Sequence, residues 1–257
     1  MVKLYPVSFR RADLAHVPPD ALLYHFLLAQ VTNSIIILRK QSIAALTGVA
    51  TETLEGNAGA AIAHLSIMFL AGRLREARLL LAAERFVAAR NEVHPKMDIS
   101  GREAFKSISR YFNAKDNILI RMRDLVSFHV DLDVATRAME RIEPELEIVD
   151  YMAIDRGNSF YGSGAVLTAY QLAELAGENG GGDAFEKLLD DVREVSLMFE
   201  DYASAFMFAF SEIYLGADIE SMEAGEITID APHIRDVRYP YFMDGEGLTP
   251  EELGSDT

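Results

Sequence analysis

Proline is confined to a few positions of this chain. Its eight prolines leave three long stretches without one, residues 20–94, 96–143 and 145–231. A proline inside a helix costs about 3 kcal/mol, because it removes a backbone N–H donor and clashes with the preceding turn. The distribution therefore predicts long helices within these stretches and places breaks between them at the prolines.

Within these stretches, apolar side chains recur at the spacing of an α-helix. The sequence predicts a first helix that begins at Ala21, capped by Asp20, and ends near Gly48. A second helix is expected to run from a turn at residues 51–56 to about Arg90. Further helices are predicted at residues 102–112, from Asp116, from Asp131 or Asp133 to near Pro144, at residues 165–175 and at residues 183–215. Such segments are typical of an all-α fold, a helical bundle of long antiparallel helices.

The C-terminal part has a different pattern. Residues 226–230 and 234–239 alternate weakly between apolar and polar side chains, which favours a small β-hairpin near the C-terminus. Residues 146–154 fit either a strand or a helical turn. The acidic, polar stretch at residues 244–257 is typical of a disordered tail.

These patterns divide the chain into three parts. We expect an N-terminal extension at residues 1–20, one helical domain at residues 21–216, and a C-terminal tail at residues 217–257 that is partly irregular or disordered. The three glycines at residues 180–182 could divide the helical part instead. The helix predicted after them is too apolar to stand alone, so we favour a single helical domain.

Composition narrows the classes of protein to consider. Half of the residues are apolar, enough for a sizeable core, and the absence of cysteine excludes disulfide scaffolds, thiol nucleophiles and cysteine-ligated zinc. Residues 1–20 lack the apolar stretch of a signal peptide, and polar residues interrupt the most apolar stretch, residues 58–74. We therefore expect a cytoplasmic protein with no membrane span.

The histidines give no indication of a metal site. None of them lies three or four residues from another, so no helix presents a pair of imidazole ligands; they are His16, His25, His64, His94, His129 and His233. Phosphate-binding and dinucleotide-binding glycine motifs are also absent from the sequence. We therefore expect neither a metal nor a cofactor.

Charge is unevenly distributed along the chain. The formal net charge of −16 argues against a general binder of polyanions. Between Arg73 and Asp124, however, 12 lysine and arginine residues stand against 7 acidic ones. This basic segment indicates a surface that faces an anion, although the solvated faces of arginine-rich helices would give the same pattern.

One short motif lies at the end of this basic segment. Arg123 and Asp124 stand six and five residues before His129, and Phe128 directly precedes the histidine. This arrangement resembles the Arg-x4–6-His motif of the HEPN superfamily, and the Phe-His pair is similar to that of HEPN-like abortive-infection proteins. A common form of the motif has a tyrosine two residues after the histidine, where this chain has Asp131. That difference counts against the nucleotidyl-transfer regulation known for the tyrosine form.

The resemblance implies a metal-independent endoribonuclease, or an RNA-binding relative, in phage defence or a toxin–antitoxin system. His129 suits removal of the 2′-hydroxyl proton, since an imidazole titrates near neutral pH. The guanidinium of Arg123 would stabilise the charge on the phosphorane, Asp124 would orient either group, and Arg121 would contact a phosphate. In the family the motifs of two protomers meet, so the resemblance also implies a homodimer, and a toxin would have an antitoxin protein as its partner.

A non-enzymatic helical scaffold that oligomerises through its apolar helices is the alternative. In that case His129 would be a half-buried histidine bonded to the backbone, and Arg123 would pair with an acid. Aromatic side chains in the last long helix would form either the core or a dimer interface; they are Phe199, Tyr202, Phe206, Phe208 and Phe210. This alternative predicts that a charge at Phe206 or Phe210 breaks the assembly.

Overall fold

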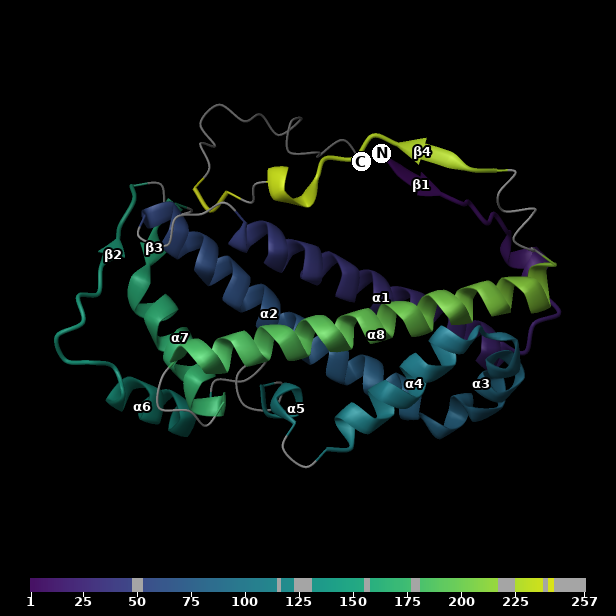
Figure 1. Cartoon of the computed structure of the whole chain (residues 1–257), viewed down its shortest axis with the longest axis horizontal. Helices are drawn as coiled ribbons and strands as arrows, with labels where there is room; N and C mark the ends of the chain where they lie inside the picture. The colour runs from purple at the N-terminus through teal and green to yellow at the C-terminus, as the bar shows by residue number, and fades with distance from the viewer. Residues whose placement is uncertain are drawn as a thin grey trace.

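The fold of the chain is all-α, as the sequence predicts (Figure 1). The computed structural model describes residues 1–47, 53–114, 117–122, 131–154, 158–176, 181–216, 225–237 and 240–242. The helices within them are α1 (Pro19–Leu46), α2 (Leu54–Ala82), α3 (Val87–Val93), α4 (Ile99–Phe112), α5 (Ile118–Met122), α6 (Leu132–Glu140), α7 (Gly162–Ala176) and α8 (Gly181–Leu215). Short 3-10 helices lie at Arg11–Leu14, Glu84–Phe86, His94–Lys96 and Ile234–Asp236. The strands are β1 (Val2–Leu4), β2 (Asp150–Tyr151), β3 (Phe160–Tyr161) and β4 (Ile227–Ile229).

Three long helices form the body of the molecule. Helix α1 runs antiparallel to both α2 and α8, and it packs along α2 over much of its length (Figure 1). Helix α4 packs on α8, while α6 and α7 pack on each other at one end of the bundle. This arrangement confirms the predicted bundle of long antiparallel helices.

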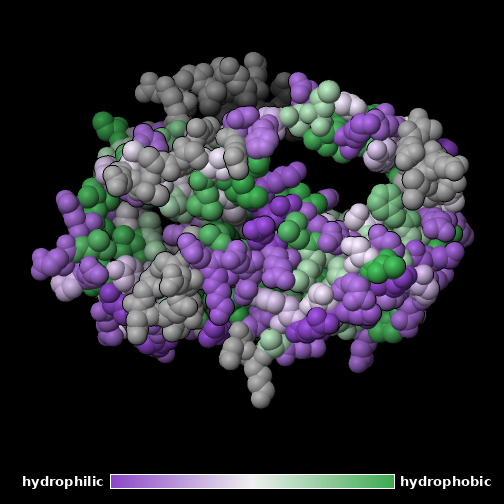
Figure 2. All heavy atoms as spheres, in the orientation of Figure 1, coloured by the Kyte–Doolittle hydropathy of each residue, from purple (hydrophilic) through white to green (hydrophobic). Residues whose placement is uncertain are grey.

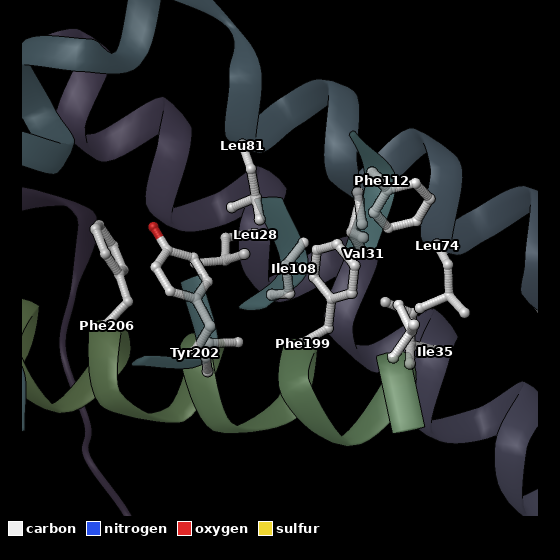
Figure 3. Close-up of a cluster of buried hydrophobic side chains, with 14 of the residues drawn as sticks. Leu28, Val31, Ile35, Leu74, Leu81, Ile108, Phe112, Phe199, Tyr202 and Phe206 are labelled. Atoms are coloured by element: carbon white, nitrogen blue, oxygen red, sulfur yellow. The ribbon is translucent and has the colours of Figure 1, made fainter. Parts of the chain in front are cut away.

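One cluster of buried side chains lies between α1, α2, α4 and α8 (Figure 3). The side chains drawn there point toward one another; they include Leu28, Val31, Ile35, Leu74, Leu81, Ile108, Phe112, Phe199, Tyr202 and Phe206. The cluster begins at Leu14 and ends at Tyr214, so part of the N-terminal extension belongs to the same core. The boundaries predicted at residues 20 and 216 stay a prediction.

The aromatic side chains of α8 serve the core of a single chain. Phe206 and Phe210 are fully buried, whereas Phe208 is 49% exposed on the opposite face. The first two therefore cannot form an interface between chains without unfolding. A charge at Phe206 or Phe210 would disrupt the core itself, so the effect of such a variant on an assembly stays a prediction.

The predicted helix caps are correct at one position and wrong at another. The Asp131 carboxylate accepts hydrogen bonds from the backbone of Asp133 and Val134, both at 3.0 Å, and so begins α6 as expected. Asp20, by contrast, lies inside α1, which begins at Pro19. Its carboxylate forms an ion pair with Arg85 at 2.7 Å. Proline is favoured in the first turn because its missing N–H needs no partner there.

Helix α2 ends at Ala82 rather than near Arg90. The backbone of Ala83 is extended, with ψ of 123°, and the chain turns before α3 begins. The turn buries Phe86 against the ring of Tyr24, with the ring centroids 5.2 Å apart. A guanidinium nitrogen of Arg90 donates to the Ala83 carbonyl at 3.1 Å. Packing against α1 therefore outweighs the local preference for a continuous helix.

A strand is present near the C-terminus, at β4, within the segment where the sequence predicts one. It pairs antiparallel with β1, with Val2 opposite Ile229, while residues 234–236 form a 3-10 helix. Lys3 and Glu226 form an ion pair beside this sheet at 3.0 Å. We call β1, β4 and residues 5–9 the strap, which lies over α1 and α8 (Figure 1).

Helices α1 and α2 are both long and apolar enough to cross a membrane, by length and composition alone. In the fold, each also contributes buried side chains to the core between α1 and α2. Buried core helices share these properties, so the two helices do not decide between a membrane and an aqueous location. The expectations of a cytoplasmic location and of no membrane span stay predictions.

Candidate functional site

The predicted catalytic residues Arg123, Asp124 and His129 lie outside the described residues. Arg121 is described, and it is exposed in the last turn of α5. Its helix is held by three apolar neighbours that face the core, Ile118, Leu119 and Met122. The amide side chain of Asn117 accepts a hydrogen bond from the Ile120 backbone at 3.1 Å and donates to the Tyr111 carbonyl at 3.0 Å. Arg121 is therefore presented to solvent by a short, anchored helix.

A group of arginines meets where α2 ends and α3 begins. Burial lowers the pKa of the Arg78 guanidinium, and the neighbouring positive charges of Arg75 and Arg90 lower it further. Neither Arg75 nor Arg78 forms a hydrogen bond or ion pair with any part of the chain that the structure describes. An arginine stays protonated in a protein, so these charges repel one another. An anion would relieve that repulsion.

Arg90 is fixed in place by the core beneath it. Its guanidinium lies 5.9 Å from the centroid of the Tyr24 ring, a distance at which a cation is attracted to the ring face. The hydroxyls of Tyr24 and Tyr202 are hydrogen-bonded to each other at 2.8 Å. Burial raises the pKa of Tyr24 well above its ordinary value and that of Tyr202 to about 12. Both phenols are thus neutral at physiological pH and do not neutralise the arginines.

His94 continues this basic surface one helical turn after Arg90. Burial lowers the pKa of its imidazole, and the charges of Arg102 and Lys106 lower it further. Its Nε2 atom is buried and has no hydrogen-bond partner among the described residues. The ring lies edge-on to Phe105, with centroids 5.8 Å apart. His94 is therefore a neutral imidazole at physiological pH and is surrounded by positive charge.

We call this set the basic corner; its members are Arg75, Arg78, Arg90, His94, Arg102 and Lys106. Three members have partners of their own. Arg90 donates to the Ala83 carbonyl. Lys106 forms an exposed ion pair with Glu103 at 2.7 Å, and Arg102 donates to the carbonyls of Pro95 and Met97. The available positive charge is thus concentrated on the arginines at the end of α2. The sequence indicates a basic segment here, but the side chains that meet are set by the turn at Ala83.

The described part of the chain contains no group of three or more histidine and acidic side chains that could hold a metal ion.

Comparison with known proteins yields no relative. No protein-family model matches the chain, and neither a curated protein nor a solved structure matches it.

Proposed function

We propose that this protein binds RNA and cleaves it as a metal-independent endoribonuclease of the HEPN type. The observation that carries the proposal is the basic corner, where arginines without acidic partners gather on a chain of net charge −16. Repulsion among these arginines destabilises the folded protein, and an anion bound between them would offset that repulsion. The same basic segment of sequence ends in the Arg123–His129 motif.

In this proposal the reaction is an attack of the 2′-oxygen of one nucleotide on its own 3′-phosphorus. His129 takes the 2′-hydroxyl proton, the new oxygen–phosphorus bond forms, and the bond to the 5′-oxygen of the next nucleotide breaks. That leaving oxygen takes up a proton, and the products are a 2′,3′-cyclic phosphate and a 5′-hydroxyl. Arg123 stabilises the charge on the phosphorane, and Asp124 orients one of the two groups.

The exposed cations would hold the RNA backbone. Arg121, Arg75 and Arg78 are the candidate phosphate contacts, since a guanidinium matches two phosphate oxygens with its planar set of donors. The acidic remainder of the surface would repel RNA elsewhere. We therefore expect the RNA backbone to follow a defined path past these arginines, without general affinity of the protein for nucleic acid.

A cleavage assay in the presence of EDTA tests the proposal. We expect the purified protein to cut single-stranded RNA, and both His129→Ala and Arg123→Ala to lose cleavage by at least about a hundredfold while keeping their circular dichroism spectra. His233→Ala is the matched control, because His233 is an exposed histidine at the far end of the sequence. Wild-type protein that neither cuts nor binds RNA, or cleavage that survives in His129→Ala, contradicts the proposal.

A homodimer belongs to the same proposal, and a helical scaffold is its alternative. Both need a surface through which chains associate, and α1 offers one. Exposed apolar side chains recur along its outer face, among them Phe26 at 48% and Ile37 at 61% exposure. We expect Phe26→Asp with Ile37→Asp to convert a dimer to a monomer in light scattering. If assembly is lost but RNA cleavage was never present, the scaffold is the better description.

A further inference from the structure

An open cavity of about 640 Å³ lies between the strap and the body of the molecule. Tyr5, Val7 and Phe9 of the strap line one side, and residues of α1 and α8 line the others. The space-filling view shows the opening beneath β1 and β4 (Figure 2). Small-molecule sites in proteins have volumes of roughly 300–1,000 Å³, so the cavity is of the size that such a ligand requires.

Two buried polar atoms belong to residues that line this cavity and lack hydrogen-bond partners among the described residues. They are the Nδ1 atom of His25 and the Oγ1 atom of Thr32, both on α1. His25 is only 8% exposed, and its ring stacks on Phe210 with the centroids 4.1 Å apart. Buried polar atoms are nearly always paired within the protein or by an ordered molecule. These two unpaired atoms place a polar zone in the α1 wall of the cavity.

The charged groups of the cavity are negative. Glu200 and Asp201 line it, whereas no lysine or arginine of the described chain does. Arg39 binds the Glu200 carboxylate through two nitrogens, at 2.7 and 2.8 Å. Asp201 has no hydrogen bond or ion pair with the residues that the structure describes. Its carboxylate can thus act as the counter-ion of a bound cation.

Aromatic rings line the same cavity. Tyr5, Phe9 and Phe208 line the cavity and keep much of their ring surface exposed. The faces of such rings attract a cation within about 6 Å of the centroid, and ammonium ligands are recognised in this way. Ala29, Ile36 and Met207 provide an apolar wall. A ligand with a positive head and an apolar body would match both kinds of surface.

We propose that this cavity binds a small organic cation, an ammonium group on an apolar body, with Asp201 as its counter-ion. The ring faces of the strap and of α8 contact the ammonium group, and the apolar wall contacts the body of the ligand. The proposal is independent of RNA binding, because the cavity shares no residue with the basic corner.

Two probes with the same ring system but opposite charge test this proposal by calorimetry. They are tryptamine, which carries an ammonium group, and indole-3-propionate, which carries a carboxylate. We expect tryptamine to bind the full chain and indole-3-propionate not to bind. Absence of tryptamine binding at millimolar concentration, or equal affinity for the two probes, overturns the proposal.

Variants then assign the binding to this cavity. Asp201→Asn, nearly unchanged in shape, is expected to weaken tryptamine binding by about tenfold, the effect of removing one charge-assisted hydrogen bond. Asp190→Asn is the matched control, since Asp190 is exposed on the same helix but does not line the cavity. Ala29→Phe fills the cavity and should abolish binding, with Ala88→Phe on the surface of α3 as its control. Unchanged affinity in Asp201→Asn overturns the proposal even if Ala29→Phe fails to fold.

Discussion

The basic corner is carried by α2, α3 and α4, whereas the acidic cavity is lined by α1, α8 and the strap. Neighbouring residues of α1 and α8 face one or the other of these two surfaces. Tyr24 and Tyr202 bond to each other in the core beneath Arg90, which is part of the basic corner. The adjacent residues His25 and Asp201 line the cavity under the strap. One residue along a helix is a rotation of about 100°, which is enough to place the next side chain on another face. The same two helices can therefore support two surfaces of opposite charge.

The largest expected effect is a loss of stability when the core beneath both surfaces is disrupted. Phe206→Ala should lower the free energy of unfolding by about 3–5 kcal/mol, because it empties a fully buried position between Tyr24 and Phe210. Phe208→Ala, at a position 49% exposed on the same helix, should lower it by less than about 1 kcal/mol. Urea denaturation monitored by circular dichroism measures both. Equal losses in the two variants would contradict the assignment of Phe206 to the buried face of α8 and of Phe208 to the exposed face.

The hydrogen bond between Tyr24 of α1 and Tyr202 of α8 has the next largest expected effect on stability. Tyr24→Phe leaves the buried Tyr202 hydroxyl without a partner, so we expect a loss of about 1–3 kcal/mol in the free energy of unfolding. The double variant with Tyr202→Phe removes both hydroxyls and should lose less than the sum of the two single variants. Strict additivity in this double-mutant cycle contradicts the hydrogen bond.

RNA affinity is expected to depend on the basic corner and not on the acidic cavity. Arg75→Ala combined with Arg78→Ala should weaken binding of single-stranded RNA and reduce the slope of log K against log salt concentration by about 1.4, because each arginine is expected to neutralise one phosphate. Asp201→Asn, on the other side of the helix pair, should leave that slope unchanged. Fluorescence anisotropy at several salt concentrations measures the slope, and equal slopes for wild type and the arginine variant count against the basic corner.

The smallest expected effect is a difference between His25 and His94 in how their pKa values respond to salt. Burial alone lowers the pKa of His25, whereas the charges of Arg102 and Lys106 add to burial at His94. Added salt screens exposed charges, so it should raise the pKa of His94 and leave that of His25 nearly constant. NMR titration of the imidazole protons at low and high salt measures both values. Parallel shifts would indicate that nearby charges act on both histidines.

The lowered pKa values of His25 and His94 also predict how the stability of the folded state depends on pH. The unfolded histidines take up protons below about pH 6.5 while the folded ones resist, so the unfolded chain binds more protons as the pH falls toward the folded pKa. The folded state should therefore lose stability as the pH falls below about 6.5. We expect a smaller loss in His25→Leu over the same pH range, measured by urea denaturation. A loss equal to that of wild type would mean that His25 titrates normally.

Local signals in the sequence determine much of the secondary structure. The proline-free stretches and the apolar spacing predict long helices, and α1, α4 and α8 lie close to the predicted ranges, whereas α2 ends at Ala82 rather than near Arg90. The Asp131 cap is predicted correctly because its bonds reach only two and three residues ahead. The strand at β4 is also visible in the alternation of its side chains.

The candidate sites depended on tertiary structure. Composition marks a basic segment, but it does not say that Arg75, Arg78 and Arg90 meet, because that follows from the turn at Ala83 and the packing of Phe86 on Tyr24. The cavity left no sequence signal, since its walls come from the strap, α1 and α8. The HEPN motif stays a prediction from sequence.

The sequence by itself determined that this chain is built from long helices, because helix formation depends on interactions within a few residues. Only the tertiary structure decided which faces of those helices meet, as when β1 pairs with β4 across more than two hundred residues. The physical reason is that burial, charge repulsion and unpaired polar atoms depend on neighbours in space. Both candidate surfaces arise at that level.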